Sequence, residues 1–251
     1  MLLSGRVAFL TGAGSGIGRA GALALAREGA AITVTDLDGA RAQDVASEIR
    51  AAGGTATGLA LDAADETAVL AAIDRVAAGG RLDILHSHAG LQIPGGLEEV
   101  SLSDMDASWR LNVRSHFIAA RAAMAVMKPR GAGSIIVTAS NSGVQYDRGM
   151  IAYTTTKHAV IAMTRQIAAD YAGDNIRCNA LCPGFVDTPF NQGFEAQMGG
   201  RSQLETYVAT SIPMRRWATV GEIAASIVYL ASDQSGFMTG HALVVDGGES
   251  L

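Results

Sequence analysis

Apolar and polar positions follow two rhythms along the chain. Short apolar runs rich in Val, Ile and Leu, each closed by Gly, Asp, Ser or Pro, are typical of buried strands. Between them, apolar residues recur every three or four positions, which predicts amphipathic helices. The runs cover 6–12, 30–36, 55–62, 82–90, 133–140, 175–184 and 241–248, and the helical segments cover Gly18–Glu28, Ala40–Ala52, Glu66–Ala78, Val160–Tyr171 and Val220–Ala231.

Strand and helix segments alternate from one end of the chain to the other. This alternation predicts an α/β fold, a doubly wound sheet of about seven parallel strands with helices on both faces. No linker or repeat divides the chain, so residues 1–251 are expected to form a single domain. Ligands of such sheets bind at the carboxyl ends of the strands. One irregular insertion, Phe190–Arg216, is long enough to serve as a lid over that edge.

Composition narrows the class of protein. Hydrophobic residues make up 49% of the chain and charged residues 17%, with a net charge of −5, so we expect a packed globular protein. No basic stripe indicates nucleic acid or an anionic membrane as a partner, and no apolar run is long enough to span a bilayer. A cytoplasmic location is therefore expected. Cys178 and Cys182 are interpreted as reduced core residues; a CxxxC redox or metal pair would lack further ligands.

The segment "TGAGSGIG", Thr11 to Gly18, follows the first predicted strand. It does not match G-x-G-x-x-G, because Ile17 stands at the last glycine position, but it has the form T-G-x-x-x-G-x-G with Gly12, Gly16 and Gly18. Glycines without a Cβ let the backbone approach a pyrophosphate, and the helix N-terminus that follows favours anions. We therefore predict a dinucleotide phosphate loop that includes Ser15; the alternative is a plain glycine-rich turn.

The second predicted strand ends in Asp36, 24 residues beyond Gly12. A carboxylate at this place accepts hydrogen bonds from an adenosine ribose and repels a 2′-phosphate. Neither Ser15 nor Leu37 offers the cation that an extra phosphate would require. Asp36 therefore predicts NAD as the cofactor in preference to NADP, unless it is only a turn residue.

Tyr153 and Lys157, in "YTTTK", lie four residues apart and so share one face of a helix. At an effective dielectric of ~20, a cation ~4 Å away is worth roughly 4 kcal/mol, which lowers the pKa of the phenol by at most about three units. The pair is thus predicted to make Tyr153 a general base near neutral pH. Taken alone, such a pair is more often an ordinary surface or core pair.

Four motifs in this order, "TGAGSGIG", "YTTTK", "PGFVDTP" and "VVDGG", resemble those of the short-chain dehydrogenase/reductase family over the whole chain. The resemblance implies a Rossmann-like fold and reversible hydride transfer between NAD and a secondary alcohol. It implies Ser140 as stabiliser of the substrate oxygen, Asn112 as holder of a water, and Lys157 as a ligand of the nicotinamide ribose. It further implies a homotetramer built on Asn112–Lys128, Tyr153–Tyr171 and the C-terminal segment.

The resemblance also implies the remaining cofactor contacts. The phosphate loop, Asp36 and Leu37 are expected to contact the cofactor. The resemblance adds further contacts from Asp62, Ala63, Ala89, Gly90, Tyr153, Lys157, Pro183, Gly184, Val186 and Thr188. One motif departs from the family: "HSHAG" has Ser87 and His88 where the family has two asparagines, which affects the hydrogen bonds that brace the sheet. His86 and His88 share a strand face, but no third ligand is evident, so no metal site is expected.

The substrate is less defined. Gln92, after "HAGL", resembles a carboxylate ligand of 3-hydroxybutyrate dehydrogenases, but Ser142 and Met150 stand where those enzymes have His and Lys. Polar residues expected near the pocket favour a sugar, polyol or small hydroxy acid: Gln92, Ser140, Asn141, Ser142, Gln145, Tyr146, Arg148, Tyr153, Asn191 and Gln192. We therefore predict an NAD-dependent dehydrogenase of a small polar alcohol. The alternatives are an NADPH-dependent carbonyl or 3-oxoacyl-type reductase and a non-catalytic dinucleotide-binding sensor.

Overall fold

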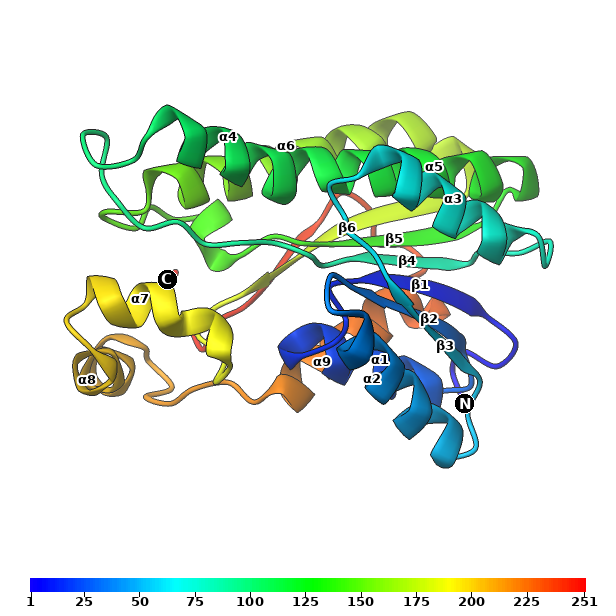
Figure 1. Ribbon diagram of the computed structural model, residues 1–251, viewed down its shortest axis with the longest axis horizontal. Helices are drawn as coiled ribbons and strands as arrows, with labels where there is room; N and C mark the ends of the chain where they lie inside the picture. Colours follow the sequence, from blue (N-terminus) through cyan, green and yellow to red (C-terminus); the bar gives the residue numbers. More distant parts are fainter.

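The computed structural model describes residues 1–251, and its centre is one sheet of seven parallel strands (Figure 1). Their order is β3-β2-β1-β4-β5-β6-β7. Each strand lies within one of the apolar runs, so the predicted fold class is confirmed. The strands are β1 (Val7–Thr11), β2 (Ala31–Asp36), β3 (Ala56–Ala60), β4 (Ile84–Ser87), β5 (Gly133–Thr138), β6 (Ile176–Pro183) and β7 (Ala242–Val245).

Helices cover both faces of the sheet (Figure 1). One layer contains α1 (Gly16–Arg27), α2 (Gly39–Ala51) and α9 (Val220–Ala231). The opposite layer contains α3 (Glu66–Ala77), α4 (Leu102–Trp109), α5 (Ser115–Arg130) and α6 (Ile151–Tyr171). The helices predicted from the sequence begin and end within a few residues of these bounds, except α6, which begins nine residues before Val160.

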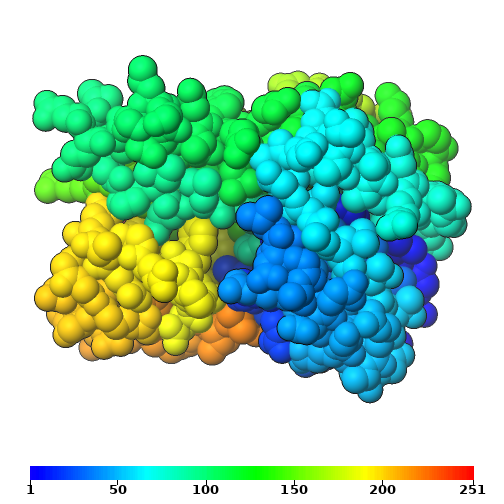
Figure 2. Space-filling model, viewed as in Figure 1, coloured from blue at the N-terminus to red at the C-terminus, as the bar shows by residue number.

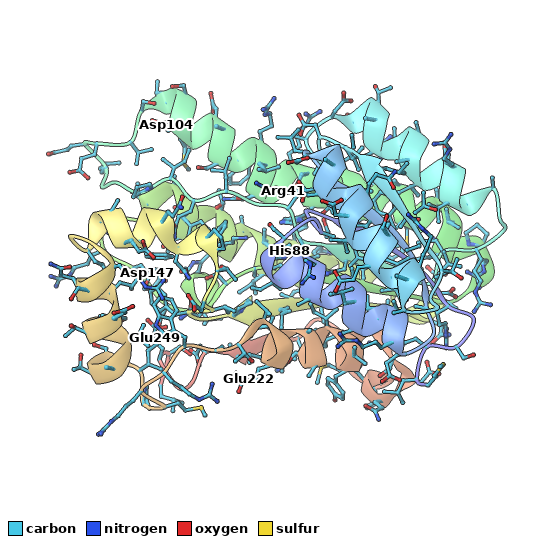
Figure 3. The ribbon with its side chains drawn as sticks, turned by 60° about the horizontal axis from the view of Figure 1, so that its bottom comes forward. Arg41, His88, Asp104, Asp147, Glu222 and Glu249 are labelled. Atoms are coloured by element: carbon cyan, nitrogen blue, oxygen red, sulfur yellow. The ribbon has the colours of Figure 1, made fainter.

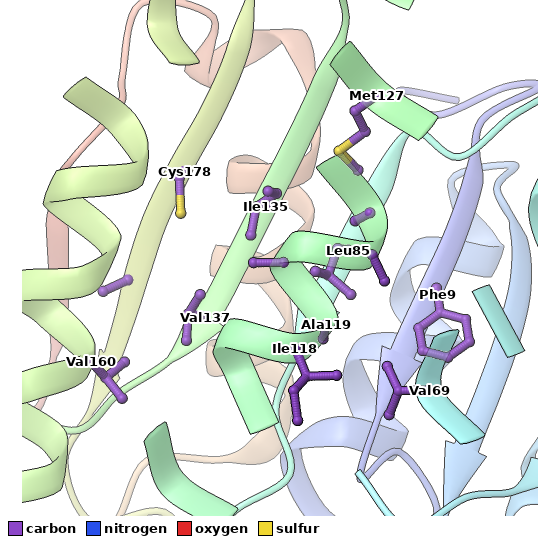
Figure 4. Close-up of a cluster of buried hydrophobic side chains, with 14 of the residues drawn as sticks. Phe9, Val69, Leu85, Ile118, Ala119, Met127, Ile135, Val137, Val160 and Cys178 are labelled. Carbon is purple, nitrogen blue, oxygen red and sulfur yellow. The ribbon is translucent and has the colours of Figure 1, made fainter. Parts of the chain in front are cut away.

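Two apolar cores form because the central strands are buried on both faces. Phe9, Leu85 and Ile135 face α3, α5 and α6 (Figure 4), while Leu10 and Ile136 face α1 and α9. Neighbouring residues of one strand therefore belong to different cores. This explains why the strands read as continuous apolar runs rather than as alternating ones.

The strand order reverses between β1 and β4. After β1 the chain builds β2 and β3 on one side, and then returns to pair β4 with the other edge of β1. The loops that follow β1 and β4 therefore separate and leave a crevice at the carboxyl ends of the strands. Open α/β sheets bind their ligands at such a point.

The segment Phe190–Arg216 is folded, and our expectation of an irregular insertion was wrong. It contains α7 (Gln192–Gln197) and α8 (Arg201–Ser211). Leu204, Val208 and Ile212 form a small separate core. In Figure 1 the C-terminus lies beside these helices, far from the N-terminus. A core of their own allows α7 and α8 to pack as a unit over the crevice.

Both cysteines are confirmed as free, buried residues of β6, and burial raises their pKa values to about 12. None of the helices is both long and apolar enough to cross a membrane. No group of three or more His, Cys, Asp or Glu side chains is arranged to hold a metal ion.

Candidate active site

A cavity of about 900 Å³ opens at the carboxyl ends of the strands, and Figure 2 shows a recess between the α7 region and the N-terminal part of the chain. Most of the residues that the sequence predicted for the site line this cavity. They are Gly12, Ser15, Gly16, Ile17, Asp36, Leu37, Asp62, Ala63, Ala89, Gly90, Ser140, Ser142, Tyr146, Tyr153, Lys157, Pro183, Gly184, Val186 and Thr188.

Four residues that the sequence placed at or near the site do not line the cavity: Gly18, Gln92, Asn112 and Gln192. Gly18 ends the phosphate loop and packs against Gly12 and Ala13, and Asn112 is hydrogen-bonded to Leu91 in the loop after β4. Gln92 lies against Gly193 of α7, and both polar atoms of its side-chain amide are buried without a partner. In this arrangement of α7, Gln92 does not line the cavity, and its contact with a substrate stays a prediction.

The phosphate loop is closely packed against neighbouring backbone. Gly12 has φ +62°, and a Cβ there would lie 2.9 Å from the Cα of Ala89. A Cβ on Gly18 would collide with the carbonyl oxygen of Gly12 and lie 2.9 Å from the Cα of Ala13. The loop leads directly into α1, whose N-cap Ser15 forms no side-chain cap, and Ser15, Gly16 and Ile17 at this helix start line the cavity. This cradle fits a pyrophosphate.

A Gly18→Ala substitution tests this packing. We expect it to lower the melting temperature by several degrees and to weaken dinucleotide binding at least about 10-fold, because the added methyl group must displace backbone. Gly221→Ala is the matched control: its Cβ would meet only the Thr219 hydroxyl, at 3.8 Å, in the first turn of α9. Thermal unfolding and calorimetric titration with NAD measure both effects. Equal behaviour of the two variants would contradict the tight cradle.

Asp36 lies at the end of β2, and its carboxylate is fixed by two backbone donors. The N–H of Gly14 donates to Oδ2 at 2.9 Å, and the N–H of Asp38 donates to Oδ1 at 3.0 Å. A carboxylate can accept further bonds, so Asp36 still has acceptor capacity toward the cavity. Sequence reasoning missed Arg41, whose Cβ packs against Gly14 beside this carboxylate and whose guanidinium pairs with Asp38 at 3.2 Å.

Ser140, Tyr153 and Lys157 meet at the other end of the cavity. Ser140 follows β5, and its side chain accepts a hydrogen bond from the N–H of Ser142 at 3.1 Å. The Lys157 ammonium lies 5.4 Å from the centre of the Tyr153 ring and donates to the Thr138 carbonyl at 3.1 Å. Both Tyr153 and Lys157 are almost completely buried. The helical spacing thus brings them together, as predicted.

The direction of the Tyr153 pKa differs from the sequence prediction. Burial raises it above its ordinary value of 10; a hydrogen bond with Ser140 opposes this effect, and Asp147 adds to it. Burial also lowers the pKa of Lys157 to about 8. Phe190 and Phe194 lie beside the Tyr153 ring, with centroids 6.2 Å away in each case, and help exclude water. The sequence revealed the neighbouring ammonium but not this dry environment.

Asn112 lies in a π-helical turn, Arg110–Arg114, between α4 and α5. Its amide donates to the Leu91 carbonyl at 2.9 Å and to the Thr156 hydroxyl at 3.1 Å, and its oxygen accepts from the Leu91 N–H at 2.8 Å. The side chain thus ties the loop after β4 to α6. The bulge directs it there, and π-bulges are frequent at functional sites.

The end of the cavity near Tyr153, here called the substrate end, is lined by both polar and apolar side chains. Tyr146 lies at its mouth, 85% exposed and stacked on His158. The sequence analysis predicted only polar residues here, but aromatic and aliphatic side chains also line the cavity: Leu111, Phe185, Phe190, Phe194 and Met198. Glu249 and Tyr207 also line this end. Neither carries a local sequence signal, because they come from the C-terminal turn and from α8.

Comparisons with known proteins agree with this geometry. The family model described as Enoyl-(Acyl carrier protein) reductase matches residues 12–250. The 2-keto-3-deoxy-L-fuconate dehydrogenase of Xanthomonas campestris pv. campestris is 38% identical over 99% of this chain and 81% of its own length. A short-chain dehydrogenase/reductase from Serratia marcescens is 35% identical and has a TM-score of 0.92 over 100% of both chains.

The chain belongs to the short-chain dehydrogenase/reductase family. It is therefore an oxidoreductase of a family that binds a nicotinamide dinucleotide. Gluconate 5-dehydrogenase from Burkholderia cenocepacia, solved with NADP and tartrate, has the same fold at 34% identity, with a TM-score of 0.92 over 99% of this chain and 96% of that one. That structure contains NADP, so the fold alone does not select NAD.

This member of the short-chain dehydrogenase/reductase family braces its sheet with histidines. His86 Nε2 and His88 Nδ1 each lie 3.0 Å from the Thr138 hydroxyl, which connects β4 to β5. Ser87 bonds to His116 Nδ1 at 2.7 Å and connects β4 to α5. Burial, followed by the charge of Lys157, lowers the pKa of His88 to about 4, so the ring is neutral at pH 7. Histidine, serine and threonine side chains thus provide the hydrogen bonds that brace the sheet, in place of the two asparagines that the family has at positions 87 and 88.

A Thr138→Val substitution leaves two buried imidazole nitrogens without a partner. We expect it to lower the free energy of unfolding by about 2–6 kcal/mol, since each of the two unsatisfied groups costs about 1–3 kcal/mol. Thr154→Val is the control, because the Thr154 hydroxyl is already buried without a hydrogen bond, so its loss should be nearly neutral. Urea unfolding at pH 7 measures both. A Thr138 variant as stable as the Thr154 variant would contradict the bracing role.

Proposed function

We propose that this protein is an NAD-dependent dehydrogenase that reversibly oxidises a secondary alcohol of a small polar substrate. One observation carries the proposal: Ser140, Tyr153 and Lys157 converge at one end of the same cavity that has the glycine cradle and Asp36 at its other end. The cradle, the helix N-terminus and the acceptor carboxylate fit the pyrophosphate and ribose of a dinucleotide.

The proposed role of each side chain follows from its position in the cavity and from whether it donates or accepts a proton. Bound NAD supplies the acceptor for the hydride that leaves the carbinol carbon. Tyr153 takes the proton of the substrate hydroxyl, and Ser140 donates a hydrogen bond to the same oxygen. Lys157, buried and adjacent, stabilises the phenolate and holds the ribose of the cofactor. Asn112 fixes the loop after β4 through its hydrogen bonds with Leu91. We also propose that Asn112 holds a water molecule, as the family resemblance implies.

Asp36 supports NAD over NADP, because a 2′-phosphate would lie against its carboxylate. Arg41 favours the second candidate, an NADPH-linked reductase, since it places a cation at the same edge of the site. We expect the wild type to prefer NAD at least about 10-fold in kcat/KM, because juxtaposed like charges cost more than the 1.4 kcal/mol that a factor of ten represents. Asp36→Ala should remove most of this preference, and Arg41→Ala should increase it. Equal use of both cofactors by the wild type would contradict the proposal.

The test of the function is a substrate panel with the purified protein. Sugars, alditols, hydroxy acids, cyclic alcohols and dihydrodiols are each offered with NAD, and reduction of the cofactor is followed by its absorbance. We expect turnover of at least one polyhydroxylated substrate. Dinucleotide binding without turnover of any alcohol or reduction of any corresponding ketone would favour the sensor alternative.

A further inference from the structure

Glu249 reaches the substrate end of the cavity from the last turn of the chain. Asp246 shapes this turn by accepting the N–H groups of Gly248 and Ser250, both at 2.9 Å. Glu249 therefore projects back toward the body of the protein, and it is partly buried. Figure 3 shows Glu249 and Asp147 in the same region, beside α7 and α8.

Hydrogen bonds connect Glu249 to the reacting end of the site. Ser140 donates to Asn141 Oδ1 at 3.2 Å, and the amide of Asn141 donates to Glu249 Oε2 at 2.8 Å. On the other side, the Tyr207 hydroxyl of α8 donates to Glu249 Oε1 at 2.9 Å. Glu249 thus accepts from two donors, which is the pattern of an ionised carboxylate, and it retains acceptor capacity for a ligand.

The charges around Glu249 are mostly negative. Burial raises the pKa of Glu249, the hydrogen bonds from Tyr207 and Asn141 oppose this effect, and Asp147 and Asp246 add to it. Asp147 and Glu249 both line the substrate end. Two cations also line the cavity: Lys157 donates to the Thr138 carbonyl beside Tyr153, and Arg148 has an exposed side chain that forms no ion pair with either carboxylate. A substrate carboxylate would therefore enter a region of like charge.

Given the proposed function, we infer that Glu249 selects neutral polyhydroxylated substrates, alditols or aldoses, over sugar acids. Its free acceptor positions bind a substrate hydroxyl remote from the reacting carbinol. Its charge, with that of Asp147, disfavours a carboxylate in that place. The aromatic wall formed by Phe185, Phe190 and Phe194 contacts the carbon face of the same substrate. Glu249 is thus a specificity residue, one hydrogen-bonded residue away from Ser140.

The experiment compares matched pairs of neutral and acidic substrates, glucitol with gluconate and threitol with threonate. We expect the wild type to prefer the neutral member of a pair at least about 10-fold in kcat/KM, a difference of about 1.4 kcal/mol. Glu249→Gln should reduce this ratio at least 10-fold, through a higher KM for the alditol and a lower KM for the aldonate. Glu98→Gln, an exposed carboxylate outside the cavity, is the control and should leave the ratio unchanged.

The possible outcomes separate this inference from the proposed function. Preferred turnover of the aldonates, or a Glu249→Gln variant that changes both members by the same factor, would overturn the inference and leave the dehydrogenase function intact. If neither pair is turned over, thermal stabilisation of the NAD complex by glucitol and gluconate replaces kinetics. A preference for glucitol that the variant loses then supports the inference, and equal stabilisation overturns it.

Discussion

We expect Tyr153→Phe to lower kcat for alcohol oxidation by about 10³-fold, within the range that general acid–base catalysis contributes. The substitution removes only the phenolic oxygen, and the ring keeps its contacts with Phe190 and Phe194. NAD affinity should therefore stay within about twofold, since no ionic ligand of the dinucleotide is lost. Steady-state kinetics and calorimetric titration with NAD measure the two quantities.

Tyr171→Phe is the matched control for Tyr153→Phe. Tyr171 ends the same helix, contacts Lys128 rather than the cavity, and should tolerate the change. A Tyr153 variant that retains more than about a tenth of the wild-type rate would remove Tyr153 from the proposed mechanism, because general acid–base catalysis contributes at least about 10²-fold.

The raised pKa of Tyr153 also sets a pH dependence. The small basic fraction of the phenol grows as pH rises, so kcat/KM for alcohol oxidation should increase from pH 7 to 9, while that for ketone reduction should stay nearly constant because the phenol remains protonated over this range. The Tyr153→Phe variant should lack the increase. This difference in pH profile separates a chemical role of Tyr153 from a purely structural one.

Lys157→Met should abolish most activity without destabilising the protein at pH 7. Lys157 is 2% exposed and has no carboxylate partner, and burial lowers its pKa to about 8. An unpaired buried ammonium is costly, and methionine removes this cost while it fills a similar volume. The lost bond to the Thr138 carbonyl offsets part of the gain. We expect kcat/KM to fall at least about 10²-fold and the free energy of unfolding to change by less than about 1 kcal/mol.

The pH dependence of stability gives a second measurement. Between the folded pKa of about 8 and the unfolded value of 10.5, folded Lys157 binds fewer protons than the unfolded chain does. The wild type therefore gains stability relative to Lys157→Met as pH rises through this window. Below the window, Lys157 is fully protonated in both the folded and the unfolded state, so this contribution no longer changes with pH. Urea unfolding at pH 7 and pH 10 measures this change. Lys128→Met removes an exposed ion pair with Asp174 and a contact with the Tyr171 ring, and its stability should not show this pH-dependent change. A large loss of stability at pH 7 in Lys157→Met would contradict the unpaired buried charge.

The fold and the phosphate-loop end of the cavity could be predicted from short stretches of sequence. In each case the residue types are determined by the immediate surroundings of the segment. Strand residues such as Phe9 and Leu10 are apolar in succession because the sheet is covered on both faces. Gly12 and Gly18 are required because backbone from the next turn or strand leaves no room for a Cβ. The spacing of these glycines along the chain is therefore enough to predict the phosphate-binding loop.

The substrate end was predicted less well, because distant segments build it. Gln92 was expected to face a substrate, but the packing of α7 places it under Gly193. Glu249 and Tyr207 had no recognisable pattern, since their meeting depends on where β7 ends and on how α8 folds back. Arg41 was missed for a similar reason: α2 brings its Cβ against Gly14, 27 positions earlier in the chain.

The sequence by itself determined the order of strands and helices, the phosphate loop and the pairing of Tyr153 with Lys157, because burial and helix periodicity act over a few residues. The tertiary structure decided the direction of the Tyr153 pKa, the bracing of β4 through Thr138 and the carboxylate at the substrate end. Desolvation and hydrogen bonding depend on which groups surround a side chain in space, and those groups come from segments as far as 108 residues apart.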